Sequence, residues 1–439
     1  MQQQQRNSRW PGFYKLSIEE RRRVAADALG ISLDELAEAL DGGLANAKAD
    51  KIVENVVGTF SLPFALALNV KVNGTDYIVP MVVEEPSVVA AASNAARMIR
   101  EGGGFEAEAD PPIMTAQVQL DDVPDAARAC DLITRHQGEL CALGDAQVPG
   151  LVRRGGGMRG LEARDLGDGM FVVHLFIDCR DAMGANLVNT VAEGVSERIR
   201  ELCGGTVGLR ILSNLCDQRK VRVRCRVPTA VLEGNGFTGA EVRDGIVRAS
   251  RFAERDPYRA ATHNKGLMNG LDAVVIATGN DWRAVESGAH AYAARNGRYE
   301  PLCVWRSENY DLVGELELPL SLGTVGGPSR VHDGARMGLR IASVGSATEL
   351  AMVAASIGMA SNLAALRALA TEGIQRGHME LHARSVAIAA GAVGSDVEAV
   401  ATLIHALGNV NLDAARRALA DLRAPLAPPP HSSAPPPAE

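Results

Sequence analysis

The sequence predicts an α+β fold in which mainly helical stretches surround a middle segment of short strands and helices. Two observations carry this prediction: helix-forming stretches with capping residues occupy the first and last parts of the chain, and alternating apolar and polar residues fill its middle. We expect a large, mainly helical domain over residues 1–108 and 217–375, an inserted small α/β domain over 109–216, a helical segment over 376–423 and a disordered Pro-rich tail over 424–439.

Composition places the chain among ordinary globular proteins. It has 439 residues, of which 46% are apolar and 22% are charged, close to globular averages. The formal net charge of −8 argues against nucleic acid or an anionic membrane as the main partner, because both attract a basic surface. No apolar run reaches the roughly 18 residues of a membrane span, and the N-terminus lacks the apolar core of a signal peptide.

The cysteines indicate a reducing compartment. There are seven, an odd number, and none has the CxxC spacing of a zinc or redox motif. We therefore expect small buried apolar side chains without disulfides, and a cytoplasmic protein.

Capping and turn residues define the first elements. Residues 17–30 carry Ser17 and Glu20 at capping-box spacing and end at a glycine, which predicts a helix. Residues 69–83 alternate around an Asn-Gly pair, which predicts a β-hairpin.

Two adjacent acids, Glu84 and Glu85, close the second strand of this hairpin. Pro86 is suited to the first turn of a helix, which we expect over residues 87–98. One interpretation is that both acids stabilise the start of that helix. The other is that a strand end presents one of them to a site.

The middle of the chain reads as a split βαβ sandwich, the natural small fold for strands and helices in this order. The expected strands cover 112–120, 169–178 and 206–214, and the expected helices cover 124–143 and 184–203.

The run at residues 220–228 alternates Val and Cys with Lys and Arg, so one face of a strand should be core and the other cationic. The simpler interpretation of the cationic face is a solvated surface. The alternative is a strip that binds the phosphates of a ligand.

Beyond residue 330 the pattern is helical almost to the end. Ser346 with Glu349, and Ser395 with Glu398, have the spacing of capping boxes, which predicts a helix start at each serine.

Residues 256–270 form the densest polar cluster in the chain. Such groups either face water or line a site, because burying them without partners is costly. An apolar run at 271–279 that resembles a strand follows, and it would place Asp281 at a strand end, where catalytic groups often lie. The polar members of the cluster are Arg259, Thr262, His263, Asn264, Lys265 and Asn269.

Two glycine-containing turns are candidates for ligand contacts. Residues 323–330 are rich in glycine, which by itself is weak evidence because glycines also serve ordinary turns. Residues 178–186 follow an expected strand and open a helix, so backbone N–H groups near Gly184 could bind phosphate. The Rossmann pattern GxGxxG is absent here, so a nucleotide site would need another architecture.

His378 and His382 are four residues apart and would share one face of a helix. They lack the glutamate of HExxH and a nearby third ligand, so we expect no metal. A histidine that donates a proton or caps a helix is favoured instead.

Several segments resemble, in order, the class II (bacterial) 3-hydroxy-3-methylglutaryl-coenzyme A (HMG-CoA) reductases, over roughly residues 12–422. The resemblance implies interconversion of HMG-CoA and mevalonate plus CoA, with two equivalents of a nicotinamide cofactor, through mevaldyl-CoA and mevaldehyde. The matching segments are ENVVGTFSLP, VVEEPSVVAAAS, DAMGAN, DPYRAATHNKG, TGNDWRAVE and ATEGIQRGHM.

The resemblance implies four catalytic residues. Glu85 of VEEPS is expected to donate a proton, and Lys265 of HNKG to stabilise negative charge on the reacting carbonyl oxygen. Asp281 of GNDWR is expected to tie these two together by hydrogen bonds. His378 of RGHM is expected to protonate the departing CoA thiolate, with His382 nearby.

The resemblance also implies binding residues and an assembly. Substrate contacts are expected from Ser87, Arg259, Thr262 and Asn269, with the arginine suited to a free carboxylate. The ENVVG segment is expected at the interface of a homodimer with shared active sites, which could assemble further. Residues after His378 are expected to form a mobile flap that closes over the substrate.

For the cofactor, the resemblance implies a dinucleotide-binding loop on the small domain. Asp145 is expected to accept the adenosine ribose hydroxyls, which favours NAD over NADP because an acid repels a 2′-phosphate. The nearby Arg153 and Arg154 could receive a 2′-phosphate instead, which keeps NADP open. The expected cofactor-binding residues are Asp145, Asp181, Ala182, Met183, Gly184, Ala185, Asn186 and Asn214.

Two alternatives remain at this point. One is a reductase of another related acyl-CoA thioester. The other is a non-catalytic protein that binds CoA or a nucleotide, against which the joint presence of the four catalytic residues weighs.

Overall fold

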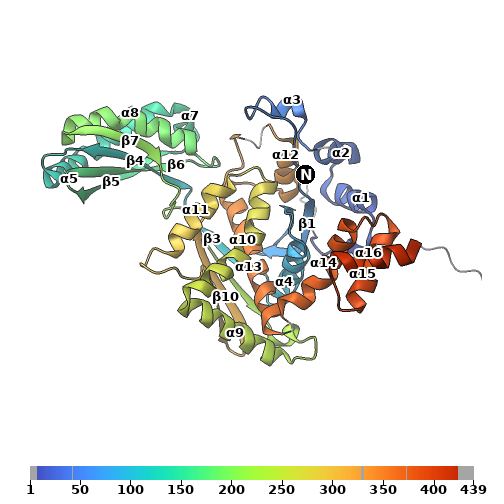
Figure 1. The fold of residues 1–439 in the computed structure, drawn as a ribbon. Coiled ribbons are helices and arrows are strands. Elements are labelled where there is room, and N and C mark those ends of the chain that lie inside the picture. Colours follow the sequence, from blue (N-terminus) through green and yellow to red (C-terminus); the bar gives the residue numbers. More distant parts are fainter. Residues whose placement is uncertain (1–6, 42, 328–330, 372, 424–439) are drawn as a thin grey trace, which may run out of the picture. The chain divides into compact units, whose positions relative to one another are not determined.

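The computed structural model describes residues 7–41, 43–327, 331–371 and 373–423, and only the backbone of 374–381. Two separate β-sheets packed with helices confirm the α+β fold class (Figure 1). Contacts divide the chain after Thr371 into two units. The Pro-rich tail expected over 424–439 lies outside the described residues.

The first unit contains a six-stranded sheet with the strand order β2–β1–β3–β8–β10–β9. The helices α4, α10 and α13 pack together with its strands around one apolar core. The strands are β1 (Phe64–Val72), β2 (Thr75–Val82), β3 (Phe105–Ala109), β8 (Lys220–Val227), β9 (Cys303–Glu308) and β10 (Asp311–Pro319). The helices are η1 (Phe13–Lys15), α1 (Ile18–Leu29), α2 (Leu33–Leu40), α3 (Asn46–Ala49), α4 (Val88–Glu101), η2 (Thr229–Leu232), α9 (Gly239–Arg255), α10 (Pro257–Ala277), α11 (Trp282–Ala293), α12 (Asp333–Ala342) and α13 (Ala347–Ala370).

The predicted hairpin is present as β1 and β2. Asn73 and Gly74 form its turn with φ of 48° and 82°, the left-handed values that a tight two-residue hairpin turn requires. Helix α4 starts at Val88, so Pro86 and Ser87 precede it and do not form its first turn.

The predicted helix over 17–30 is also present. Ser17 caps α1 and forms the full capping box with Glu20, and the left-handed Gly30 ends the helix.

The strand-like run at 271–279 is in fact the last part of α10, so Asp281 does not follow a strand. Helix α10 is 21 residues long, and its apolar second half is buried against α13 and β2. A helix buried on most sides shows a continuous apolar run, which periodicity cannot distinguish from a buried strand.

Helix α13 has the length and apolar composition of a membrane span, but 78% of that window is buried inside the structure. Ser346 caps its start by accepting a hydrogen bond from Glu349 N, as the spacing predicted. α13 is thus the central core helix of the first unit.

The small domain has the expected split βαβ order and its own apolar core. Its antiparallel sheet has the order β5–β6–β4–β7. The sequence pattern missed β5, which contains three glycines and four charged residues and is exposed over much of its length. The elements are β4 (Ile113–Asp121), α5 (Ala126–Arg135), α6 (Gln137–Gln147), α7 (Pro149–Val152), β5 (Gly157–Gly167), β6 (Met170–Asp178), α8 (Ala185–Cys203) and β7 (Thr206–Leu212).

The second unit has a small apolar core of its own. Ser395 is the first residue of α15 and not its cap, because Gly394 occupies the capping position. Its helices are α14 (Ile374–Ala389), α15 (Ser395–Ala406) and α16 (Leu412–Arg423).

Candidate active site

Glu85 and Lys265 lie in direct contact. Lys265 Nζ donates to Glu85 Oε2 at 2.7 Å, and Asn269 Nδ2 donates to the same oxygen at 3.2 Å. Glu85 comes from the segment between β2 and α4, whereas Lys265 and Asn269 are one helical turn apart on α10. The hairpin and the core helix therefore bring together a carboxyl group and an ammonium group 180 residues apart in the chain.

The polar cluster predicted from the sequence forms a stripe along the first half of α10. Arg259, Thr262, Lys265 and Asn269 follow one another at spacings of three, three and four residues, which places them along one side of the helix. His263 and Asn264, in the same segment, point the other way and are buried. The stripe therefore offers a substrate several polar contacts in one row.

Arg259 has the environment of an anion-binding residue. It is half-buried, and burial lowers the pKa of its guanidinium. Among the described residues no carboxylate forms an ion pair with it. Ser87, at the start of α4 with a left-handed φ of 75°, is also half-buried and lies two residues after Glu85.

Within one chain, the hydrogen bonds described for Glu85 and Lys265 do not include Asp281, which the resemblance implies as the residue that ties the two together. The Asp281 carboxylate caps α11 by accepting a hydrogen bond from Ala284 N at 3.1 Å. The neighbouring Asn280 N bonds to Val275 O near the end of α10. Lys265 lies ten residues before Val275 on the same helix, which is about 15 Å along its axis at about 1.5 Å per residue.

The DAMGAN loop lies between β6 and α8, as predicted. Gly184, with a left-handed φ of 108°, precedes α8, whose first N–H groups therefore open toward the loop. The residues Ala182 to Asn186 are suited to a phosphate, because a helix N-terminus attracts anions. The Asp181 carboxylate, in contrast, caps α13 by accepting a hydrogen bond from Ala347 N at 2.9 Å, so it has a structural partner.

Asp145 lies at the same end of the small domain as this loop. Its Oδ1 accepts a hydrogen bond from Met158 N at 2.7 Å, next to Gly157, which pairs with Asp178 at the end of β6. A side chain on Gly157 would collide with this carboxylate, since its Cβ would lie 2.4 Å from Oδ1. The glycines that follow Arg153 and Arg154 thus leave room for the acid.

The remaining cofactor candidates are exposed. Arg153 and Arg154 lie at the end of α7, and Asn214 lies beyond β7 with its backbone oxygen against Gly288 of α11.

His378 belongs to α14, and its side chain lies outside the described residues. His382, on the same helix, is exposed. Within the described part of the chain, no group of three His, Cys, Asp or Glu residues is arranged to hold a metal ion.

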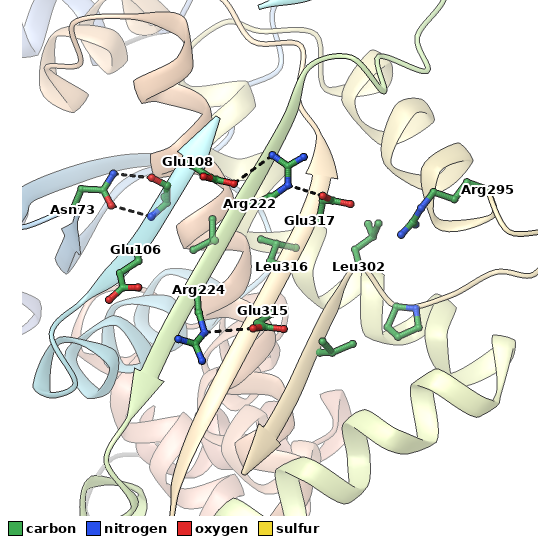
Figure 2. Close-up of a pocket in the computed structure, with 14 residues that line it drawn as sticks. Asn73, Glu106, Glu108, Arg222, Arg224, Arg295, Leu302, Glu315, Leu316 and Glu317 are labelled. Carbon is green, nitrogen blue, oxygen red and sulfur yellow. Dashed lines mark hydrogen bonds and ion pairs between the residues drawn. The ribbon is translucent and has the colours of Figure 1, made fainter. Parts of the chain in front are cut away.

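The cationic strip on β8 is neutralised by neighbouring strands, which favours the solvated-face interpretation. Arg222 pairs with Asp110 and Glu317, and Arg224 pairs with Glu308. Figure 2 shows Arg222 between Glu108 and Glu317, and Arg224 beside Glu315. These side chains line a hollow of about 620 Å³ on the face of the sheet. The carboxylates already pair with the arginines, so phosphates would have to compete with them.

Three residues near the DAMGAN loop were not assigned a role from the sequence: Arg219, Asn280 and Gly323. Gly323 lies in the glycine-rich turn and Asn280 in the TGNDWRAVE segment, whereas Arg219 lies in no quoted motif. Arg219 is only 3% exposed, although an isolated arginine in a sequence predicts a surface position. The contacts of these three residues with the DAMGAN loop depend on which backbone atoms the fold places beside them.

Comparisons with known proteins identify the family of the chain. A family model described as hydroxymethylglutaryl-coenzyme A reductase matches residues 17–383. The 3-hydroxy-3-methylglutaryl-coenzyme A reductase of Archaeoglobus fulgidus is 48% identical over 421 residues, which are 95% of each chain. A probable reductase of the same name from Borreliella burgdorferi is 34% identical and covers 78% of this chain and 79% of its own.

Solved structures give the same result. A 3-hydroxy-3-methylglutaryl-coenzyme A reductase from Streptococcus pneumoniae has a TM-score of 0.80 and 42% identity, covering 94% of this chain and all of its own. The class II enzyme of that organism bound to NADPH in open conformations has a TM-score of 0.79 and 43% identity, covering 83% of this chain and 100% of its own. On the fold, the site and these similarities, the chain belongs to the hydroxymethylglutaryl-coenzyme A reductase family.

Proposed function

We propose that the chain interconverts (S)-3-hydroxy-3-methylglutaryl-CoA and (R)-mevalonate plus CoA, a four-electron reaction with two equivalents of nicotinamide cofactor. The observation that carries this proposal is the hydrogen-bonded group of Glu85, Lys265 and Asn269 beside the stripe on α10. A carboxyl group and an ammonium in contact suit a carbonyl reduction, in which an oxygen gains negative charge and then a proton.

The residues on α10 and after β2 have separable roles in this reaction. Arg259 is placed to bind the free carboxylate of the hydroxymethylglutaryl group, and Thr262 and Ser87 to orient that group. Lys265 stabilises the negative charge that develops on the carbonyl oxygen, and Glu85 delivers the proton to it. Asn269 holds the Glu85 carboxyl group in place through its hydrogen bond.

The cofactor half of the site belongs to the small domain. When bound, a reduced nicotinamide supplies the hydride for each reduction step. The DAMGAN loop and the N-terminus of α8 are suited to the pyrophosphate, and Asn214 lies beyond β7 on the same domain. Asp145 supports a preference for NAD, because one of its oxygens is anchored on Met158 N and an acid here repels a 2′-phosphate.

The site is completed by a second copy of the chain. The Lys265 side chain is 61% exposed in one chain, whereas an ammonium stabilises an oxyanion best where water is excluded. Asp281 lies too far along α10 to reach Lys265 of its own chain. In the proposed homodimer, the partner supplies Asp281 and the cofactor loop, and the segment that carries His378 closes over the substrate and protonates the CoA thiolate.

Absorbance of reduced nicotinamide tests the reaction. Purified protein given HMG-CoA should oxidise NADH faster than NADPH, and given mevalonate, CoA and NAD it should form NADH. Faster turnover with NADPH would support the reaction but contradict the preference for NAD that Asp145 predicts. Arg153 and Arg154 would then be assigned to the 2′-phosphate. A folded protein without turnover in either direction would contradict the reaction and favour a binding protein.

A further inference from the structure

Arg219 is a buried cation between the small domain and the six-stranded sheet. It is 3% exposed, and its guanidinium donates to the carbonyl oxygens of Ala182 at 3.3 Å and Met183 at 3.4 Å, and also to that of Leu322. Within the described residues, no carboxylate forms an ion pair with it. The charges of Asp178 and Asp181 lie near enough to act on it, but the hydrogen bonds described for its guanidinium all go to carbonyl oxygens. A buried charge is normally paired, so this arrangement indicates a specific task.

Asn280 holds the other side of the same loop through the segment that follows β10. Its Oδ1 accepts from Gly323 N at 2.7 Å, and its Nδ2 donates to Gly323 O at 3.1 Å. Gly323 in turn lies against the DAMGAN loop, where a Cβ would come within 2.4 Å of Met183 N. Thr324 N also donates to Asp181 O at 2.8 Å, so the backbones of the two segments are joined.

Asn280 directly precedes Asp281 in the chain and is itself fixed to the end of α10 through Thr278 Oγ1 at 3.0 Å. A continuous series of hydrogen bonds and close contacts therefore runs from the residue beside Asp281 to the backbone of the cofactor loop. Asp281 and the DAMGAN loop are therefore held together at the C-terminal end of α10.

We propose that Arg219 and Asn280 are positioning residues for the cofactor, forming a clamp that fixes the DAMGAN loop in register with Asp281 and places a buried positive charge behind the pyrophosphate site. This inference rests on the proposed dinucleotide role of the loop. The guanidinium binds the carbonyl oxygens of Ala182 and Met183, which keeps these partial negative charges turned away from the loop opening. The N–H groups at the start of α8 are then free to face a bound anion.

Three variants test the clamp. Arg219→Gln should raise the cofactor KM roughly tenfold or more, by the usual cost of losing a charged hydrogen-bonding group, and leave the HMG-CoA KM within about twofold. Arg219→Lys should recover part of that loss, because it keeps the charge. Asn280→Ala should raise the cofactor KM and also lower kcat, because it loosens the segment that holds Asp281.

Arg100→Gln is the matched control for the loss of a largely buried arginine. The Arg100 side chain is 18% exposed and pairs with Asp76, away from the cofactor loop. It should lower thermal stability without changing the cofactor KM.

Titration of NADH by its fluorescence on the whole protein separates the clamp from the reaction, since binding needs no turnover. Weaker NADH binding by Arg219→Gln and by Asn280→Ala, against unchanged binding by Arg100→Gln, supports the clamp even if turnover is absent. Unchanged NADH affinity in both Arg219→Gln and Asn280→Ala would overturn the clamp. An equal rise of the cofactor KM and the HMG-CoA KM in these variants would overturn it too. If Arg219→Gln does not fold, Asn280→Ala alone decides by the same criteria.

Discussion

At the residue scale, the proposed chemistry depends on the Glu85 Oε2 atom, which accepts hydrogen bonds from both Lys265 and Asn269. The two hydrogen bonds hold the Glu85 carboxyl group beside the Lys265 ammonium, where a substrate oxygen could contact both groups. Glu84, its neighbour in the sequence, is exposed. The two acids that close β2 therefore have different environments, which supports the proposed proton-donor role for Glu85 and not for Glu84.

Replacing Glu85 by Gln tests this assignment. The amide keeps the shape and the contact with the α10 stripe but cannot donate an acidic proton, so kcat should fall by about 10²–10⁴-fold with a small change in the HMG-CoA KM. Glu84→Gln is the control and should stay within about twofold of wild type, because a substitution of one exposed side chain seldom matters. Steady-state rates decide, and near-normal turnover of Glu85→Gln would remove the acid role.

His263 predicts a pH dependence of stability. Burial lowers the pKa of its imidazole to about 4, although a hydrogen bond to Cys303 O opposes the shift. Between about pH 6.5 and pH 4 the unfolded chain therefore binds more protons than the folded chain, so the free energy of unfolding falls as the pH falls. The contribution of neutral His263 to the free energy of unfolding is fully present above about pH 6.5.

The variant His263→Gln isolates this effect, because the amide can still donate to Cys303 O but does not titrate. In urea unfolding, wild type should lose about 2 kcal/mol more than the variant between about pH 7.5 and pH 5. Equal losses in the two proteins would show that His263 is not the titrating group.

Sequence reasoning found the residues that carry a local motif and missed those defined by packing. Glu85, Lys265 and Asn269 lie in recognisable segments, and the structure brings them together. The exposed position of Asp281 at the far end of α10 depends on that helix being continuous, which the pattern did not show. Arg219 was not predicted at all, because its partners are backbone oxygens that carry no residue identity.

At the scale of elements, α10 joins the core to the site. Its polar stripe contacts Glu85 through Lys265 and Asn269, and its apolar residues pack against α13. Small residues let the two helices approach closely, and Gly270 is the tightest point: a Cβ there would lie 2.7 Å from Ser361 Cβ and 2.8 Å from Ile357 O. Gly266, one turn earlier, has 3.8 Å to Ala365 Cβ and so has room.

Alanine at these two glycines gives a matched comparison on one helix. Alanine favours a helix interior over glycine by up to about 1 kcal/mol, whereas forcing a methyl group into a packed interface costs about 1–3 kcal/mol. Gly266→Ala should therefore leave the free energy of unfolding unchanged or raise it, and Gly270→Ala should lower it by about 1–2 kcal/mol. Equal effects in chemical denaturation would contradict the close packing of α10 on α13.

Elements with local signals were predictable, and buried or polar ones were not. The Asn-Gly turn and the Ser17 capping box specified the hairpin and α1 directly. β5 was missed because its glycines and charged residues give a weak strand pattern. β3, β9 and β10 were missed because pairing in the sheet, of β3 and β10 with β8 and of β9 with β10, stabilises them more than their own pattern indicates. The large domain is consequently less purely helical than its sequence suggests.

At the scale of the whole molecule, the proposal divides the site of one chain into two halves that are separated along α10. Glu85 and Lys265, at the middle of the helix, are assigned to the substrate half, and Asp281 and the DAMGAN loop, beyond its C-terminal end, to the cofactor half. A symmetric pair of chains can join one half from each, which gives two complete sites per dimer. The central claim is that each site is shared in this way, which predicts that neither the substrate half nor the cofactor half is active without the other.

Mixing two inactive variants tests that claim most directly. Glu85→Gln damages only the substrate half and Asp281→Asn only the cofactor half, so a mixed dimer contains one site with both residues intact. After the two variants are unfolded together and refolded, random pairing should restore about a quarter of wild-type HMG-CoA reduction, because about half of the dimers are mixed and each has one of two sites intact. Activity no higher than that of either variant alone, in a sample shown to contain mixed dimers, would contradict the shared site.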